Sequence, residues 1–305
     1  MKFSRKSVKG WGSARSSRHL VEPSATHRLK TVCLHLSRAL CVPRALCLML
    51  AALSMMVSAR PAEESSSTEL ASSSMSLKVA VAANFTPALK ALIKAYDAHS
   101  DQEIVVISGS TGKLFTQIEH GAPFDLFFAA DQKRPAMLVK NGLALPESQF
   151  TYAIGALVLW SKRWDAQEAR ERLLSGRFER LAMANPKLAP YGEAAIASMA
   201  SLGVKLEEGE NKILEGENIA QAFQFLRFGS ADLGFVSLSQ IRQHETSNSV
   251  KASYWVIPAK HHSPIAQDVV VLERSHDNKN TAKFLRFIQS EQARNIMLDY
   301  GYSQP

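Results

Sequence analysis

The chain has 305 residues and a formal charge of +8 at neutral pH, a balance that at first suggests a nucleic-acid-binding protein. The charge is unevenly distributed. Residues 1–59 hold ten basic residues and one acidic residue, which leaves 26 basic and 27 acidic residues for 60–305. Because this body is nearly neutral, strong non-specific binding to nucleic acid is excluded. All three cysteines lie within the first 47 residues, so the body has no disulfide, thiol nucleophile or cysteine-ligated metal.

The first 59 residues have the pattern of an export signal. An uncharged apolar run, "ALCLMLAALSMMVSA", covers residues 45–59, follows basic residues and ends in small residues suited to cleavage. An uncleaved membrane anchor is the alternative, although the run is short for a span. We expect a periplasmic protein in which the serine-rich residues 60–76 are a disordered spacer. The charged region is unusually long, and translation that starts near Val42 would explain it.

From residue 77 onward, apolar runs typical of strands alternate with amphipathic stretches typical of helices. The pattern predicts strands at 77–83, 103–108, 124–130 and 264–274, and helices at 86–100, 113–121, 132–142 and 280–302. Strand, loop and helix recur in 179–203, and helix, turn and strand in 217–241. The β runs at 152–162 and 252–258 are places where the chain could cross between two lobes. We therefore expect an α/β fold of two lobes, each a mainly parallel sheet flanked by helices, with the ligand in the cleft between them.

The segment "SGSTGK" at 108–113 joins a predicted strand to a predicted helix, as phosphate-binding loops do. It is not a P-loop, because the first glycine would fall at Ile107 and the required Ser or Thr is Leu114. The glycine spacing of dinucleotide-binding loops is missing as well. The segment can still offer an anion its backbone N–H groups, the hydroxyls of Ser110 and Thr111 and a positive helix end. An ordinary capped turn is the alternative.

Three other junctions between a strand and a helix carry possible hydrogen-bond donors. Asn84 has a side-chain amide, and Tyr191 has both a backbone N–H and a hydroxyl. Ile219 offers a backbone N–H behind a cap formed by Glu217 or Asn218. Each junction alone could be a turn or a helix cap. Four such junctions spread over both predicted lobes favour a shared anion site.

Signatures of an enzyme are missing from the sequence. It has no G-x-S-x-G and no H-E-x-x-H motif, and the pair His261-His262 has no second metal-binding cluster beside it. Asp125 and Asp131 flank an apolar run and could form a carboxylate pair, but turn anchors explain them more simply. We expect neither an enzyme nor a bound cofactor or metal cation.

Taken together, "VAVAANFTPALKAL", "IEHGAPFDLFFAAD", "ANPKLAPYG", "ENIAQAF" and "ADLGFVSLSQ" resemble the periplasmic molybdate-binding proteins of ATP-driven importers, from residue 77 to the C-terminus. The resemblance implies the type II periplasmic binding-protein fold. We expect residues 77–155 and 258–305 to form lobe I and residues 156–257 to form lobe II. The resemblance further implies that neutral donors hold molybdate or tungstate as a desolvated tetrahedral oxyanion. A monomer would deliver the anion to an ABC permease and its ATPase.

The resemblance also assigns a set of donors that come from both lobes: Asn84, Ser110, Thr111, Tyr191 and Ile219. Some family members add a tyrosine hydroxyl where this chain has Ser237, so that donor is missing or is replaced by Tyr191. A binding protein for sulfate, phosphate or a carboxylate remains an alternative. The effector lobe of a regulator would need a helix-turn-helix, and an enzyme on the same fold would need converging acid and base residues. The sequence offers neither pattern.

Overall fold

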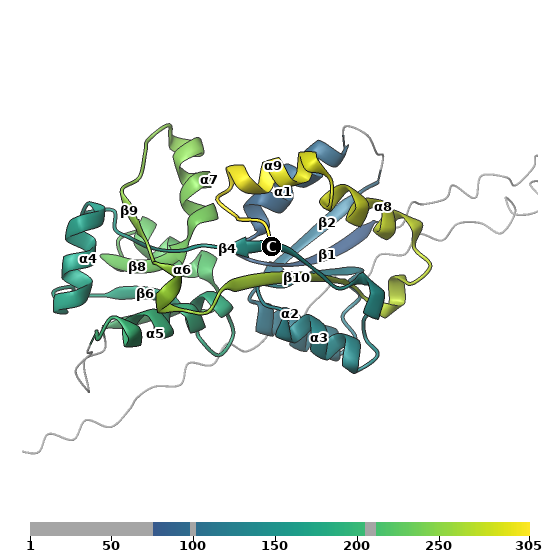
Figure 1. Ribbon diagram of the computed structural model, residues 1–305, viewed down its shortest axis with the longest axis horizontal. Helices are drawn as coiled ribbons and strands as arrows, with labels where there is room; N and C mark the ends of the chain where they lie inside the picture. The colour runs from purple at the N-terminus through teal and green to yellow at the C-terminus, as the bar shows by residue number, and fades with distance from the viewer. Residues whose placement is uncertain (1–75, 98–101, 205–211) are drawn as a thin grey trace, which may run out of the picture. The chain divides into compact units, whose positions relative to one another are not determined.

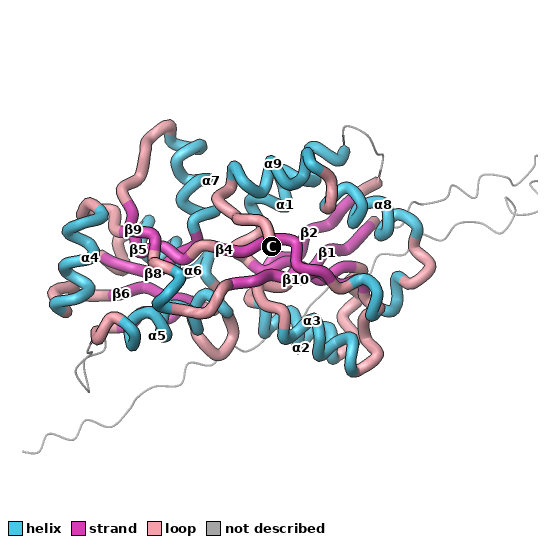
Figure 2. The backbone as a smooth tube through the Cα atoms, viewed as in Figure 1, coloured by secondary structure: helices cyan, strands magenta, loops and turns pink. Residues whose placement is uncertain are grey.

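The computed structural model describes residues 76–97, 102–204 and 212–305. The predicted export signal and the predicted spacer up to residue 75 lie outside the described residues. The described residues contain two five-stranded sheets (Figures 1 and 2). The first sheet has the order β2-β1-β3-β10-β4, with β1 (Leu77–Ala82), β2 (Ile104–Gly109), β3 (Leu126–Phe128), β4 (Phe150–Gly155) and β10 (Ile265–Val271). The second has the order β7-β6-β8-β5-β9, with β5 (Leu157–Trp160), β6 (Leu181–Ala184), β7 (Ile213–Gly216), β8 (Leu233–Ser237) and β9 (Tyr254–Val256).

Helices connect and flank these strands. Those next to the first sheet are α1 (Thr86–Asp97), α2 (Thr111–Glu119), α3 (Lys133–Lys140), α8 (Lys279–Ile288) and α9 (Glu291–Asp299). Those next to the second are α4 (Ala166–Ser175), α5 (Pro190–Ser201), α6 (Ile219–Arg227) and α7 (Leu238–Asn248). Short 3₁₀ turns lie at Pro146–Ser148, Ala259–His261 and Glu273–Ser275. The α/β alternation predicted from the sequence is therefore confirmed.

Each sheet is mainly parallel, as predicted, but contains one strand that runs against the other four. Strand β1 is parallel to β2 and β3, and β6 is parallel to β7 and β8. By contrast, β10 is antiparallel to β3 and β4, and β5 is antiparallel to β8 and β9. Parallel strands within one sheet are joined by helical crossovers. The passage from the first sheet to the second is much shorter, because only Ala156 separates the end of β4 from the start of β5. The chain returns from β9 to β10 through residues 257–264.

The first sheet buries both faces, as expected for strands covered on two sides. On β1, Val79 and Val81 pack in a cluster with residues of α1, α8 and α9, while Ala80 faces a second cluster with residues of α2 and α3. Figure 1 shows α2 and α3 on the opposite side of this sheet from α1, α8 and α9. Strand β10 alternates in the same way, with Val269 on one face and Val270 on the other. This alternation fixes the register and so the position at which each strand ends.

Polar residues at the ends of the strands and helices act as local anchors. Asp125, just before β3, accepts hydrogen bonds from the Lys78 backbone N–H and the Ser275 hydroxyl. Asp131 accepts from the Arg134 backbone N–H and forms an ion pair with its guanidinium. Both aspartates therefore anchor turns, as the simpler sequence interpretation predicts.

An aromatic cluster fills the first sheet next to the start of α1. The Phe85 ring lies 4.5 Å from the Tyr152 ring and 5.3 Å from the Tyr302 ring, measured between centroids. Both tyrosines are buried, and their hydroxyls donate to the backbone carbonyls of Ala129 (3.0 Å) and Asn84 (2.8 Å) respectively. Burial raises the pKa of Tyr152 well above its usual value, and the nearby Tyr302 and Tyr191 add to the shift. Burial likewise raises the pKa of Tyr302.

These phenols make alkaline stability a test of the core. In the unfolded chain tyrosines lose their protons at about pH 10, whereas the folded protein keeps these buried tyrosines protonated. The free energy of unfolding should therefore fall as the pH rises above that value. Each buried tyrosine contributes a slope of about −1.4 kcal/mol per pH unit. We expect Tyr302→Phe to make the slope shallower by about that amount. Urea unfolding of both proteins between about pH 9.5 and 11.5 measures it. Equal slopes would show that Tyr302 ionises alike in both states.

Candidate functional site

The predicted donor residues all lie just beyond the carboxyl ends of parallel strands. Asn84 follows β1, Ser110 and Thr111 follow β2, Tyr191 follows β6, and Ile219 follows β7. At most 3% of the surface of any of these residues is exposed. In open α/β sheets this edge is where ligands bind.

Polar contacts join the junctions of the first sheet to the elements around the second. The backbone N–H of Gly112, in the first turn of α2, donates to the carbonyl of Leu188, which precedes α5 (2.9 Å). Nearby, Lys113 Nζ lies 2.6 Å from Glu217 Oε2, just before the cap of α6. The N-terminal ends of α2, α5 and α6 therefore meet at one place.

Several buried backbone N–H groups at these junctions have no acceptor. Within the described residues, no hydrogen bond uses the backbone N–H of Asn84, Ser110, Thr111, Tyr191 or Ile219. Thr111 and Ile219 are the first residues of their helices and Tyr191 is the second of its own, so no carbonyl of the same helix can reach them. Buried N–H groups are nearly always paired, so this arrangement calls for an acceptor such as an anion.

Two hydroxyls at the start of α2 are also oriented as donors. Thr111 Oγ1 accepts from the backbone N–H of Ala130 at 3.1 Å. Ser110 caps α2, and its Oγ accepts from the backbone N–H of Lys113 at 3.4 Å. Since each oxygen already accepts a bond from the protein, the proton of each hydroxyl remains to be donated.

Asn84 is held by a buried network. Its Nδ2 donates to Gln267 Oε1 (2.8 Å) and to the Tyr302 hydroxyl (3.1 Å), so both amide protons are used within the protein. The backbone carbonyl of Asn84 accepts from the Tyr302 hydroxyl and from the hydroxyl of Ser239 in α7 (2.7 Å). The sequence interpretation gave the amide of Asn84 the donor role. In this arrangement, the backbone N–H of Asn84 is its unpaired donor.

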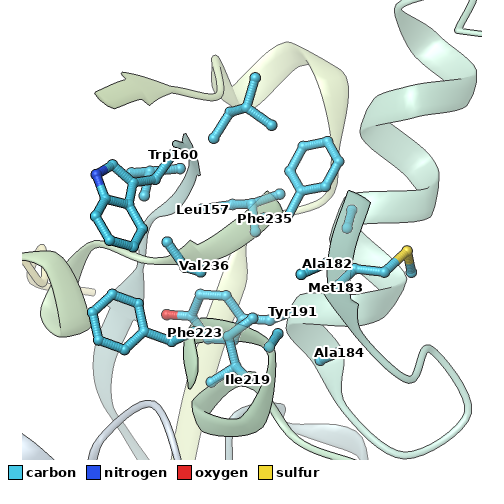
Figure 3. Close-up of a cluster of buried hydrophobic side chains, with 14 of the residues drawn as sticks. Leu157, Trp160, Ala182, Met183, Ala184, Tyr191, Ile219, Phe223, Phe235 and Val236 are labelled. Atoms are coloured by element: carbon cyan, nitrogen blue, oxygen red, sulfur yellow. The ribbon is translucent and has the colours of Figure 1, made fainter. Parts of the chain in front are cut away.

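The Tyr191 side chain belongs to the core of the second sheet. Figure 3 shows its ring beside Ile219 and Phe223, in the cluster that packs on β5, β6 and β8. Its hydroxyl reaches toward Gly155 and the Gln267 amide but makes no hydrogen bond. Burial raises the pKa of Tyr191 well above its usual value, and Tyr302 adds to the shift, while the neighbouring Gln267 and Asn84 amides partly oppose it. The phenol is therefore neutral at physiological pH.

Sequence reasoning missed several residues of this region. Gln267, Tyr302 and Ser239 hold the Asn84 loop, and Lys113 pairs with Glu217 across the junctions. The sequence did offer one indication of Gln267, because it is a polar residue within the strand sequence "IAQDVVV". Ser237 is fully buried, and its hydroxyl donates to Gln240 Oε1.

The site is built from neutral groups. Within residues 76–97, 102–204 and 212–305, no three His, Cys, Asp or Glu side chains are grouped so that they could hold a metal ion. Lys113 is paired with Glu217, and Arg134 with Asp131. The remaining positive potential comes from the ends of α2, α5 and α6.

No helix in the described part of the chain is both long and apolar enough to cross a membrane.

Comparison with known proteins places this fold among solute-binding proteins. The molybdate-binding protein ModA of Azotobacter vinelandii is 38% identical over 227 residues, which are 74% of this chain and 89% of that protein. ModA of Rhodobacter capsulatus is 39% identical over 223 residues, or 73% of this chain and 86% of that protein. The structure of the Azotobacter vinelandii periplasmic molybdate-binding protein matches with a TM-score of 0.69 and 36% identity, covering 75% of this chain and 99% of that one.

More distant structures share the fold alone. The sulfate-binding protein SubI of Mycobacterium tuberculosis has a TM-score of 0.63 at 14% identity and covers 74% of this chain and 86% of its own. The family described as "Bacterial extracellular solute-binding protein" matches residues 77–303. Both sheets and all four junctions lie within that match. The chain therefore belongs to the bacterial extracellular solute-binding protein family.

Proposed function

We propose that the protein binds molybdate as a tetrahedral oxyanion at the four junctions and delivers it to an ABC permease and its ATPase. The observation that carries the proposal is the set of unpaired backbone N–H groups of Asn84, Thr111, Tyr191 and Ile219. A buried dianion is costly unless its oxygens are hydrogen-bonded, and these donors supply such bonds without a counter-charge. The relatives named as molybdate-binding proteins support molybdate as the anion.

The chemistry of the donors favours molybdate over phosphate. Molybdate is fully ionised at neutral pH and needs only donors, whereas phosphate keeps a proton that needs an acceptor. Ser110 and Thr111 already accept bonds from the protein, so their hydroxyls are better suited to donate. Tungstate has the same charge and tetrahedral shape and is included in the proposal. Sulfate remains the alternative anion, because it is also a fully ionised tetrahedron.

We further propose that residues 77–155 with 258–305 and residues 156–257 are two lobes that close on the anion. The contacts between Gly112 and Leu188 and between Lys113 and Glu217 support a closed form, because each joins a junction of one sheet to a junction of the other. The closed protein, acting as an exported monomer without enzymatic activity or cofactor, would dock on the permease.

The primary test is calorimetric titration of the purified protein with molybdate, tungstate, sulfate and phosphate. We expect one-to-one binding of molybdate and tungstate, with sulfate and phosphate bound at least a hundredfold more weakly, a difference of about 3 kcal/mol. Tight binding of sulfate alone would establish the alternative. Absence of binding with all four anions would reject the proposed function.

The donor role of Thr111 can be tested with a matched pair of variants. Thr111→Val removes the hydroxyl at nearly constant shape, and we expect molybdate to bind about tenfold to a hundredfold more weakly, because a hydrogen bond to a charged group contributes about 1.5–3 kcal/mol. Thr111→Ser keeps the hydroxyl and should bind almost normally. Thermal unfolding without ligand separates this effect from the loss of the Ala130 hydrogen bond. Equal affinity for Thr111→Val and wild type would remove Thr111 from the site.

The Lys113–Glu217 ion pair predicts an effect on anion release. Both side chains are about half exposed, so the pair contributes no more than about 1 kcal/mol. We expect Lys113→Gln to speed molybdate release by up to about fivefold, and high salt to abolish the difference. Arg172→Gln, which breaks an ion pair within α4, is the control and should not change the rate. Stopped-flow displacement measures both, and equal rates for Lys113→Gln and wild type would contradict a closing contact.

A further inference from the structure

Gln267 is a fully buried polar side chain in the centre of β10, next to the buried Asp268. Its Oε1 accepts from Asn84 Nδ2 at 2.8 Å and from the Tyr152 hydroxyl at 3.0 Å. The single proton of the Tyr152 hydroxyl is also within reach of the Ala129 carbonyl, so Asn84 Nδ2 is the donor that identifies that end of the side chain as the carbonyl oxygen. The other end, Nε2, must therefore face away from Asn84 and Tyr152.

A bulge between β10 and β4 creates this geometry. Gln267 pairs with Ala153, but the next residue, Asp268, pairs with Thr151, so Tyr152 has no partner in the ladder. A bulge of this kind redirects side chains near functional sites. The Tyr152 hydroxyl consequently reaches Gln267 Oε1.

Nε2 of Gln267 and the hydroxyl of Tyr191 are both buried and both lack a hydrogen-bond partner. Both atoms lie next to the Cα of Gly155. A Cβ added to that glycine would be 2.1 Å from the Tyr191 hydroxyl and 2.5 Å from Gln267 Nε2. Glycine at 155 is what leaves room for the two atoms to approach one another. An unpaired amide donor next to an unpaired hydroxyl oxygen is a hydrogen bond that a small movement would complete.

We propose that Gln267 is a positioning residue for the anion site. When the anion is bound, Nε2 donates to the Tyr191 hydroxyl while Oε1 keeps its bond to Asn84. One buried amide then fixes the Asn84 loop of the first sheet relative to the start of α5 next to the second sheet. The backbone N–H groups of Asn84 and Tyr191, one from each side, are thereby held at the spacing of a single oxyanion. The proposal rests on the proposed function and adds to it a residue that touches the donors but not the ligand.

The surroundings of Gln267 allow a test by pH. The titratable groups near it are Tyr152, Tyr191 and Tyr302, whose pKa values burial raises, together with Asp268 and Asp131. The tyrosines stay protonated between about pH 5.5 and 9 because their usual pKa is about 10. Asp268 accepts from Thr151 and from the side chain of Gln149, which satisfies its carboxylate. Asp131 is paired with Arg134.

The decisive variant is Gln267→Glu in the full protein, titrated with molybdate between about pH 5.5 and 9. Burial raises the pKa of the introduced carboxyl, which in its protonated form can still accept from Asn84 and donate to Tyr191. Once it ionises, the donor is lost and a negative charge lies near the dianion. We expect near-normal affinity at the low end of this range and at least about tenfold weaker binding at the high end. The molybdate affinity of the wild-type protein should not change over this pH range.

Gln289→Glu is the control, because it adds the same charge at an exposed position and should follow wild type at every pH. A folded Gln267→Glu protein whose affinity is as independent of pH as that of wild type would overturn the proposal. A wild type that binds no oxyanion would instead reject the proposed function, and the role of Gln267 with it.

A double-mutant cycle decides the matter if Gln267→Glu does not fold. Gln267→Met removes both polar ends at similar volume, and Tyr191→Phe removes only the hydroxyl. If Gln267 acts through Tyr191, each change should weaken molybdate binding, and the effect of Gln267→Met should be smaller by at least about threefold in the Tyr191→Phe background. Additive effects on the dissociation constant would overturn the proposal.

Discussion

Buried backbone N–H groups without an acceptor are the constraint on which this structure depends. At Asn84, Thr111, Tyr191 and Ile219 the chain ends a strand or begins a helix, and the N–H group of each residue is left unpaired. Each such group costs about 1–3 kcal/mol when it has neither water nor an acceptor. The free energy comes from the apolar clusters on both sheets, which hold the four junctions in place. An oxyanion bound as proposed would remove that cost at all four junctions at once.

Rigidity behind the donors matters as much as the donors. The Asn84 loop is fixed through its amide and its carbonyl by Gln267, Tyr302 and Ser239. Two buried tyrosines and Phe85 pack against one another beneath this loop. A donor that is already oriented loses little entropy on binding, so more of its interaction energy becomes affinity. In the proposed site, the first sheet would thus supply donors that are already oriented.

Much of this architecture follows from local patterns in the sequence. The alternation of strand and helix periods predicts the elements, and cap residues such as Ser110 and Asn218 mark where helices begin. The four junctions could therefore be placed at the same edges of the sheets from the sequence alone. The single reversed strand in each sheet, β10 in the first and β5 in the second, could not, because it depends on which strands pair in the folded protein.

The contacts between distant residues also lay outside local reasoning. The amide of Asn84 turns toward Gln267, which lies 183 residues away along the chain. The pairing of Lys113 with Glu217 likewise depends on the meeting of two helix ends. The one available hint was a polar residue in an apolar strand, since a buried glutamine needs partners. Its partners became visible only with the tertiary structure.

The crossing from β4 to β5 through Ala156 has a consequence for the energetics of opening. In the proposed closure, backbone angles at this crossing and in residues 257–264 would change as the junctions of the two sheets separate. The contacts that would part include the bonds of Gly112 with Leu188, Lys113 with Glu217 and the Ser239 hydroxyl with the Asn84 backbone carbonyl. A ligand bonded by donors from both sides would favour the closed form, since only a difference in affinity between two forms shifts their populations.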